Sequence, residues 1–332
     1  MNEPLVSVII VNWNHGHLLP GCLDVLLAQE YRNLDITIVD NGSQDGSPAW
    51  IALRYPTVRL WPFPDNRGFA AGLNWGVDHT QGDLILSLNP DVTVTARFVA
   101  ELVQALVHDI EIGIVAPKLL QAAEPARLDS TGLFVDRRRH PYDRGQGERD
   151  LGQYDTMLDV FGACGAAALY RRSMLTDLAV DGEYFDEAFF AYYEDADLAW
   201  RAQLQGWRGV YAPRAVALHA RGRGDTLRKR GRSPKSAIGP RLALRNRYLM
   251  TIKNDSIAHF LADLPLVLAA ELPRLGYAAV TRPQILLGIL DLVCELPSAR
   301  AKRRQMHCRW TVDPATVRHW FATPPAVPHC GE

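Results

Sequence analysis

The sequence predicts an α/β fold, in which helices flank a mostly parallel central sheet and a helical extension follows at the C-terminus. Over residues 6–117, short apolar runs of strand length alternate with segments whose apolar residues have helical spacing. Polar residues gather where these runs end, as they do at the carboxyl ends of strands in an open α/β sheet. A length of 332 residues leaves room for a catalytic domain and a smaller appendage.

Four strands are predicted in the first part of the chain, at 6–11, 34–39, 58–63 and 84–88. Helical spacing follows the first strand, a turn-rich segment and a helix near 48–55 follow the second, and the loop 65–74 leads from the third into another helix. The fourth run, LILSL, is typical of a strand buried on both faces. It ends at Asn89-Pro90-Asp91, because Pro90 cannot donate a ladder hydrogen bond.

Further along, we predict a helix at 97–107, a strand at 112–117 and a strand at 210–218 that ends at His219. The segment 125–154 is rich in Gly and Arg, and we expect a mobile loop or an irregular hairpin across the substrate side. We divide the chain into a main domain at 1–254, with a first half of about 1–117 and a second half of about 118–254. An amphipathic helical extension at 255–322 and a disordered tail at 323–332 follow.

Residues 257–296 form the most apolar part of the chain, but charged side chains interrupt them, and Pro265, Pro273 and Pro283 are expected to break them into short helices. No uninterrupted apolar run of about 20 residues occurs there, so a membrane-spanning helix is not expected. Residues 221–253 contain eleven Lys or Arg and one acid. Two interpretations stay open: amphipathic helices that lie on an anionic membrane surface, or helices that pack on the catalytic domain.

Composition and missing motifs exclude several classes of protein. A net charge of −1 gives no general attraction to nucleic acid. The five cysteines are odd in number and contain no CxxC pair, which favours reduced thiols in a cytoplasmic protein, and no secretory signal is visible. The motifs of a dinucleotide-binding dehydrogenase, a P-loop NTPase, a zinc protease and an α/β-hydrolase are absent.

Three successive strands end near an Asp, at Asp40, Asp65 and Asp91, and parallel strands would deliver all three to one sheet edge. Asp40 is placed to contact a ribose or a base, although local sequence alone favours an Asx turn or a helix cap. Asn89 and Asp91 offer hard oxygen ligands for Mg²⁺ or Mn²⁺, and a simple turn after the strand would also explain them. His219 is a possible second ligand, although a lone His at a strand end is usually structural.

A second cluster of carboxylates, Glu194, Asp195 and Asp197, lies in the first turn of a predicted helix. Acids in this position interact favourably with the helix dipole, which is one explanation for them. The aromatic run at 185–193 just before them offers a second explanation. It could wall a pocket, stack on a sugar and seat one carboxylate as a general base.

Five segments taken together resemble the family 2 inverting glycosyltransferases of the GT-A fold, and among them the bacterial rhamnosyltransferase-like enzymes of cell-surface polysaccharide assembly. They are VIIVNWN at 8–14, VDNGSQDGS at 39–47, NRGFAAGLN at 66–74, NPD at 89–91 and YEDADLAWR at 193–201. The resemblance covers roughly residues 5–254. The resemblance is specific because all five motifs occur, and they occur in the same order along the chain as in the family.

The resemblance implies inverting transfer of a sugar, with dTDP-rhamnose as the expected donor, to a cell-surface polysaccharide or a polyprenyl-diphosphate-linked glycan. The alternatives are a UDP-sugar donor, or a non-catalytic membrane-associated nucleotide-binding protein. A sugar nucleotidyltransferase is disfavoured, because no Gly- and Arg-rich loop follows the first strand. The processive QxxRW motif is also absent, which favours the addition of one or few sugars.

The resemblance also implies roles for individual residues. Asp195 would be the general base, and Asp91 would hold a divalent metal, Mg²⁺ or Mn²⁺, with His219. Asn89 stands where many members of the family have a first Asp. The implied donor-binding residues are Asn12, Asn14, Asp40, Asn41, Asn66, Gly68, Asn74, Asn89 and Asp91, and the acceptor-side candidates are Gly162, Tyr193, Glu194, Asp197 and Arg201.

Overall fold

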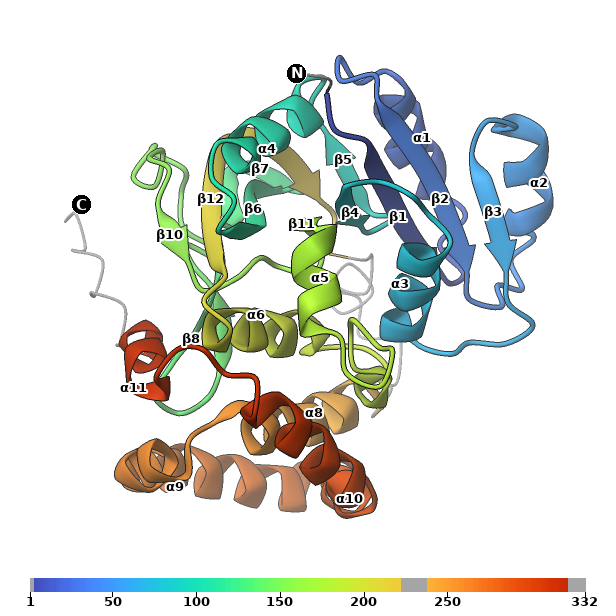
Figure 1. The fold of residues 1–332 in the computed structure, drawn as a ribbon. Helices are drawn as coiled ribbons and strands as arrows, with labels where there is room; N and C mark the ends of the chain where they lie inside the picture. Colours follow the sequence, from blue (N-terminus) through green and yellow to red (C-terminus); the bar gives the residue numbers. More distant parts are fainter. Residues whose placement is uncertain (1–2, 222–237, 322–332) are drawn as a thin grey trace.

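The computed structural model describes residues 3–221 and 238–321. Within these residues ten strands form one sheet, whose main order is β10-β12-β6-β11-β4-β1-β2-β3, with β5 and β7 paired to β12 and β6. Figure 1 shows the sheet above a layer of C-terminal helices. The strands are β1 Val6–Asn12, β2 Leu34–Asp40, β3 Arg59–Pro62, β4 Leu84–Leu88, β5 Val92–Val94, β6 Ile112–Gln121, β7 Glu124–Ser130, β8 Leu133–Val135, β9 Pro141–Asp143, β10 Asp159–Val160, β11 Ala167–Arg171 and β12 Arg208–His219.

Helices cover both faces of the sheet. One face packs against α1, α2 and α4, and the other packs against α3, α5 and α6, so that two apolar cores form. The helices are α1 Leu19–Leu27, α2 Ser47–Arg54, α3 Phe69–Asp78, α4 Phe98–Val107, α5 Arg172–Leu178, α6 Glu194–Leu204, α8 Ile238–Asn254, α9 Ile257–Thr281, α10 Leu287–His307 and α11 Pro314–Val317, with 3-10 turns η1 Glu187–Phe189, η2 Pro283–Leu286 and η3 Arg318–Phe321.

The parallel part of the sheet is confirmed at β1 to β4. β1 pairs in parallel with β2 and β4, and β2 pairs in parallel with β3. All residues of β1 and β4 are buried, as expected for strands covered on both faces. The register of β1 and β2 sets Asn12 beside Asp40.

The other half of the sheet is mixed. β11 lies between β4 and β6 and is antiparallel to both, whereas β12 is parallel to β6. Since β4 and β6 are both antiparallel to β11, they run in the same direction as each other. β12 and β1, which are parallel to β6 and β4, share that direction. The carboxyl end of β12 therefore lies at the same edge of the sheet as the ends of β1 and β2.

The segment 125–154 contains ordered strands, so the expected mobile loop is wrong and the hairpin alternative is right. β7 pairs with β6, and β8 and β9 form a separate two-stranded hairpin. The turn of this hairpin is held by α9, because Arg137 and Arg139 donate to Asp263 of that helix at 2.5 and 3.0 Å. Ion pairs to a distant part of the chain are not visible in the local sequence pattern.

One further expectation is wrong: Pro265 and Pro273 do not break the C-terminal segment, since both lie inside the continuous helix α9. Each proline removes a hydrogen bond to the carbonyl four residues earlier, on Leu261 and Ala269. Both of these residues are exposed, so the freed carbonyls are not buried. Pro283 does end the helical run, because α9 stops at Thr281 and Pro283 begins η2.

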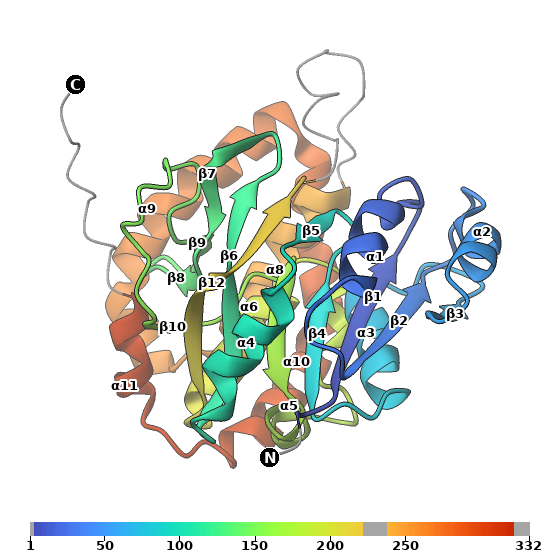
Figure 2. The ribbon, with the colours of Figure 1, turned by 90° about the horizontal axis from the view of Figure 1, so that it is seen from above.

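α8 and α10 pack on each other, and α8 also packs on α6. Seen from above in Figure 2, α9 and α11 lie on the side of β7 to β10, and β1, β2, β3 and α2 extend to the opposite side. Within residues 3–221 and 238–321, none of the helices has the length and apolar character needed to cross a membrane. Residues 222–237 of the basic run at 221–253 lie outside the described residues, as does the tail at 323–332.

Candidate active site

The edge formed by the ends of β1 and β2 gathers several of the predicted donor-binding residues. The Asn12 amide is fully buried and donates to Asp40 at 2.7 Å and to the Ser43 and Ser47 hydroxyls at 3.1 Å. The other Asp40 oxygen accepts from the Ser43 backbone N–H at 2.9 Å. Asp40 therefore makes the turn-type contacts that local sequence favoured, and Asn12 holds it from the neighbouring strand.

The next loops are tied to one another by amide side chains. Asn41 donates to the Gly68 carbonyl at 2.9 Å and accepts from the Arg67 N–H at 3.0 Å. Asn66 accepts from the Gly68 N–H at 2.9 Å. Asn14 lies at the rim of this edge, where its side chain accepts from the Gln44 N–H at 2.7 Å. The predicted residues thus build two connected loops above the strand ends.

Asn74 is the predicted donor-binding residue that lies apart from these loops. Its side chain is buried in the middle of α3, donates to the Phe185 carbonyl at 2.8 Å and accepts from the Phe185 N–H at 2.9 Å. It also donates to Glu187 at 3.0 Å. These contacts connect α3 to the segment before α6, so we leave Asn74 out of the donor group.

Asp91 and His219 face each other across β5 and β12. The register pairs His219 with Val92, and the His219 Nε2 atom lies 3.5 Å from Asp91 Oδ1. The His219 Nδ1–H donates to Asp129 of β7 at 2.7 Å. Burial lowers the pKa of His219, but its hydrogen bonds to Asp129 and Asp91 outweigh burial and raise the pKa to about 9. Asn89, which ends β4, is bonded through its backbone N–H to the Ala166 carbonyl at 2.9 Å.

These two side chains can supply two of the ligands of a divalent ion. Asp91 offers a carboxylate. His219, whose raised pKa keeps it protonated at neutral pH, would present the Nε2 lone pair when a metal displaces the Nε2 proton and Nδ1–H stays bonded to Asp129. Asp129 is the outer partner that orients such a histidine. Within the described residues, no group of three or more His, Cys, Asp or Glu side chains could hold a metal. One carboxylate and one imidazole could serve as two ligands of a divalent ion whose other positions are filled by substrate phosphates or water.

Asp195 lies at the N-terminus of α6 and is half-buried. Its two oxygens accept from the Gly165 N–H at 2.7 Å and from the Ala196 N–H at 2.8 Å. Burial raises the pKa of Asp195 to about 6, although these backbone hydrogen bonds act to lower it. A carboxylate with this pKa is mostly ionised at neutral pH and still basic enough to accept a proton from a reacting hydroxyl.

Comparison with known proteins identifies the family. A sequence model described as glycosyl transferase family 2 matches residues 7–179, more than half of the chain. The chain belongs to glycosyl transferase family 2. An N-acetylglucosaminyl-diphospho-decaprenol L-rhamnosyltransferase from Mycobacterium tuberculosis is 28% identical over 262 residues, which cover 70% of this chain and 80% of that relative. An N-acetylglucosaminyltransferase from Azorhizobium caulinodans is 28% identical over 224 residues, which cover 64% of this chain and 54% of that relative.

Solved structures show that this glycosyltransferase has the GT-A fold. The mannosyltransferase PcManGT from Pyrobaculum calidifontis, in complex with GDP-Man and Mn²⁺, has a TM-score of 0.54 and 18% identity, over 96% of this chain and 87% of that chain. GalNAc-T7 with UDP, GalNAc and Mn²⁺ has a TM-score of 0.54 and 14% identity, over 66% of this chain and 44% of that chain. The predicted fold and family are confirmed, and the non-catalytic alternative is set aside.

The acceptor-side candidates of the glycosyltransferase divide into two groups. Tyr193 and Glu194 lie at the start of α6 next to Asp195. Glu194 is 6% exposed, and burial raises its pKa to about 8. Gly162 has a packing role, because a Cβ atom there would lie 2.4 Å from the Ala199 Cβ atom of α6. Its backbone is paired with Leu133 of the β8 strand.

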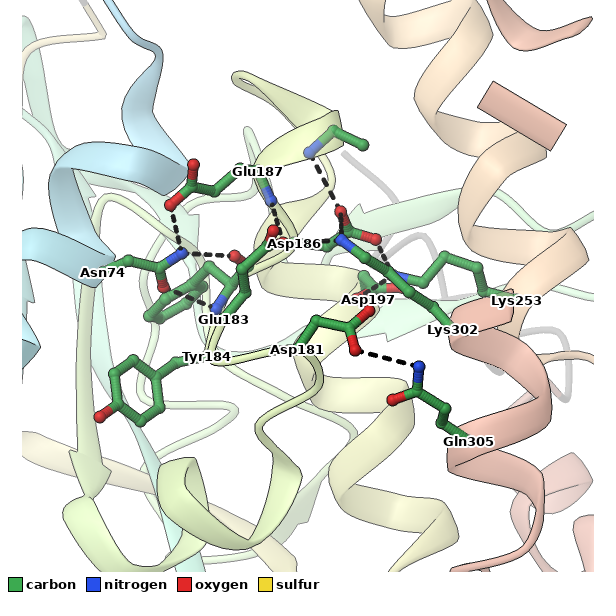
Figure 3. A network of polar contacts seen from close by, with 12 residues as sticks. Asn74, Asp181, Glu183, Tyr184, Asp186, Glu187, Asp197, Lys253, Lys302 and Gln305 are labelled. Atoms are coloured by element: carbon green, nitrogen blue, oxygen red, sulfur yellow. Dashed lines mark hydrogen bonds and ion pairs between the residues drawn. The ribbon is translucent and has the colours of Figure 1, made fainter. Parts of the chain in front are cut away.

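Asp197 and Arg201 form the second group, and both side chains are buried away from Asp195. Arg201 donates to Asp197 at 2.9 Å, and the Lys253 ammonium of α8 lies 2.9 Å from the same carboxylate. Lys253 and Lys302 of α10 also bind Asp186 at 2.5 and 2.8 Å, as Figure 3 shows. The contacts of Asp197 and Arg201 therefore do not support an acceptor-side role. Lys253 connects α6 to α8 through Asp197, and Lys302 connects the segment before α6 to α10 through Asp186.

Two acidic residues near the site were missed by sequence reasoning. Asp129 of β7 is fully buried and binds His219 and Arg221. Asp143 of β9 lies near Asp195 and helps to raise the pKa of that carboxyl. The carboxyl of Asp143 also has a raised pKa, because it is buried. Both residues belong to the Gly- and Arg-rich segment 125–154, where no hydrophobic period predicted strands.

Proposed function

We propose that this glycosyltransferase transfers rhamnose from dTDP-rhamnose, with inversion, to a cell-surface polysaccharide or a polyprenyl-diphosphate-linked glycan. The Mycobacterium tuberculosis relative supports both parts of the proposal, because its name specifies a rhamnosyl donor and a lipid-linked acceptor. A UDP-sugar donor is the second candidate. The Azorhizobium relative is named as an N-acetylglucosaminyltransferase, which favours a transferred sugar other than rhamnose.

The observation that carries the proposed chemistry is the half-buried Asp195 carboxylate at the start of α6, with its pKa raised to about 6. In the proposed step, an acceptor hydroxyl loses its proton to Asp195 as its oxygen bonds to the anomeric carbon of the donor. The bond from that carbon to the nucleoside diphosphate breaks, and the bonding electrons leave with the diphosphate. Attack opposite the leaving group inverts the anomeric configuration.

On the donor side, the loops built by Asn12, Asp40, Asn41 and Asn66 are proposed to surround the base and ribose, with Asn14 and Gly68 at their rim. Asp91 and His219 would hold a divalent metal. A metal bound there supplies positive charge that stabilises the departing diphosphate. Asn89 contributes no carboxylate, so the protein would provide a sparse ligand set and the diphosphate would complete it.

Thermal stability with added ligands tests the donor, because a ligand that binds the native state raises the apparent stability. We expect dTDP-rhamnose to raise the melting temperature more than UDP- or GDP-sugars do, and more with Mn²⁺ than without it. A larger shift with a UDP-sugar would replace rhamnose in the proposal. Asp195→Asn should keep the donor-induced shift and lose transfer, whereas normal transfer by this variant would overturn the assignment of the base.

We also propose that the helical extension at 255–322 binds an anionic membrane surface. The buried residues of α9 are Asp263, Val267 and Glu271, so the face turned inward is largely charged. A separate face exposes apolar side chains: Ile257 is 71%, Leu261 58%, Leu268 45% and Leu272 63% exposed. A helix that packs charge inward and exposes leucine outward fits a lipid surface better than water.

The charge of the extension favours anionic lipid over a second protein as the partner of this face. The described part of the extension, residues 255–321, contains eight Lys and Arg and six Asp and Glu, and Lys302 is the one buried base among them. Three of these acids, Asp255, Asp263 and Glu271, are buried in ion pairs with arginines. The exposed surface is therefore more basic than the composition indicates, and clustered basic residues beside exposed leucines attract anionic headgroups.

Point substitutions test the membrane proposal without removing buried charges. We expect Leu261→Gln, Leu268→Gln and Leu272→Gln together to abolish co-sedimentation with vesicles that contain phosphatidylglycerol. The matched control replaces three exposed leucines outside the extension, Leu53, Leu151 and Leu158, with Gln. Equal sedimentation of the two triple variants would overturn the proposal. A self-associating face would instead reveal itself as a concentration-dependent dimer in the absence of vesicles.

A further inference from the structure

The turn that leads into α6 has an unusual backbone. Phe190 has φ 62° and ψ −61°, and Tyr192 and Tyr193 both have φ 73°. The Ala191 N–H donates to the Phe189 carbonyl at 2.7 Å, which closes a γ-turn around Phe190. Positive φ is unfavourable for aromatic residues, and this type of γ-turn is rare. Three such residues within four positions persist only where the surrounding structure holds them.

Asn246 of α8 holds this turn from behind. Its side-chain nitrogen lies 2.8 Å from each of three carbonyl oxygens, those of Phe189, Ala191 and Tyr192, and its side chain is fully buried. Arg245 donates to the Asn246 oxygen at 2.9 Å and thereby fixes which end of the amide faces the turn. The two N–H donors of this amide are thus shared among three carbonyl oxygens.

The opposite side of the turn contacts the donor loops. The Phe190 carbonyl accepts from the Phe69 N–H at 2.5 Å and from the Ala70 N–H at 3.3 Å, so it caps the first turn of α3. Gly68 lies against the same residue, and a Cβ atom there would be 2.6 Å from the Phe190 carbonyl oxygen. One short turn therefore contacts both the loop that carries Asn66 and the helix that begins beside Asp195.

We propose that Asn246 is a positioning residue that holds the turn 189–193 and thereby sets Asp195 at a fixed place relative to the Asn66–Gly68 loop. The catalytic half of this inference rests on the proposed role of Asp195, whereas the structural half does not. Other contacts hold the residues that precede this turn: Asn74 binds Phe185, and two lysines bind Asp186 (Figure 3). Asn246 holds residues 189–192, which come directly before α6.

The variant Asn246→Ala tests the proposal, with Asn254→Ala as the matched control. Asn254 is also a buried amide on α8, but it donates to Asp197 at 2.8 Å and does not reach the turn. We expect Asn246→Ala to lower kcat for transfer by roughly 10²-fold with a smaller change in the donor KM, because a displaced catalytic group costs about that much. Asn254→Ala should keep kcat within a few-fold of the wild type.

Amide hydrogen exchange gives a readout that needs no substrate. The amide protons of Phe69 and Ala70 are bonded to the Phe190 carbonyl, so they should exchange roughly tenfold faster or more in Asn246→Ala and at the wild-type rate in Asn254→Ala. Equal exchange and equal kcat in the two variants would overturn the inference. A wild-type protein without transferase activity, together with the expected exchange, would instead overturn the proposed function and leave the turn-holding role intact.

A rescue experiment separates positioning from general loss of stability. Tyr192 is 55% exposed, and glycine adopts positive φ readily, so Tyr192→Gly should restore most of the kcat lost in Asn246→Ala. If Asn246→Ala alone does not fold, the double variant becomes the test. A double variant that is unfolded, or that has the low kcat of the single variant, contradicts the inference.

Discussion

Replacing the Asp195 carboxylate with an amide should stabilise the protein at neutral pH while it abolishes transfer. The pKa of Asp195 in the folded protein is about 6, against an ordinary value of 3.8. Since folding raises this pKa, the ionised carboxylate destabilises the folded state at pH values above 6. The cost diminishes as the pH falls from 6 towards 4, and it disappears where the carboxyl is protonated in both states.

The size of the effect follows from this difference in pKa. At pH 7 the cost of ionised Asp195 is at most ~3 kcal/mol. Asparagine keeps one acceptor oxygen for the two backbone donors, Gly165 and Ala196, and the loss of the other hydrogen bond costs ~1 kcal/mol. We therefore expect Asp195→Asn to raise the free energy of unfolding by ~1 to 2 kcal/mol at pH 7 and to leave it nearly unchanged at about pH 4.5.

Urea unfolding at the two pH values, combined with a transfer assay, measures both consequences. Loss of a positioned base should lower turnover by ~10²- to 10⁴-fold. In the wild-type protein, turnover should fall about tenfold for each pH unit below 6, because only ionised Asp195 accepts the proton. A variant that is less stable at pH 7, or a stability gain of the same size at pH 4.5, would refute the reasoning.

Three other substitutions test separate features. Asp91→Ala should weaken the Mn²⁺-dependent part of dTDP binding at least ~10-fold in calorimetry, and unchanged binding would remove the metal from this position. Gly162→Ala should lower the free energy of unfolding by ~1 to 3 kcal/mol, because its Cβ atom would meet Ala199 at 2.4 Å, and a variant as stable as the wild type would contradict this contact. Lys253→Met should cost ~3 to 5 kcal/mol in urea unfolding, because two buried carboxylates lose a shared partner, whereas a loss below ~1 kcal/mol would show that the ion pairs contribute little.

The first four strands of the sheet were predictable because the information is local. β1 and β4 are apolar runs of the right length, and burial on both faces removes the alternation that would otherwise complicate the pattern. The short edge strand β3 is mostly exposed and gives a weaker signal. Local sequence also favoured the turn contacts that Asp40 makes with Ser43. The position of His219 beside Asp91 needed one assumption in addition, namely that the last strand runs parallel to the first.

The features that were missed depend on partners far away in the sequence. Asp129 meets His219 across 90 positions, and Arg139 meets Asp263 across 124. Asp197 and Arg201 were expected on the acceptor side, and the local sequence could not reveal that Lys253 of another helix binds the Asp197 carboxylate. The continuity of α9 through its prolines was missed for a similar reason. Whether a helix accommodates a proline depends on which backbone carbonyls are exposed in the folded protein.

The antiparallel strand β11 has a consequence for the order in which the protein can fold. Strands β4 and β6 are not neighbours in the sheet, and β11 lies between them and pairs with both. Until residues 167–171 have left the ribosome, the two halves of the sheet can only form as separate pieces with open edges. A fragment that stops before residue 167 would contain the loops after β1 and β2 but lack β11 and β12. One edge of β4 and both edges of β6 would then lose these strand partners, a state prone to aggregation. Because the antiparallel strand β11 lies in the middle of the sheet, the sheet cannot be completed before the second half of the chain has been synthesised.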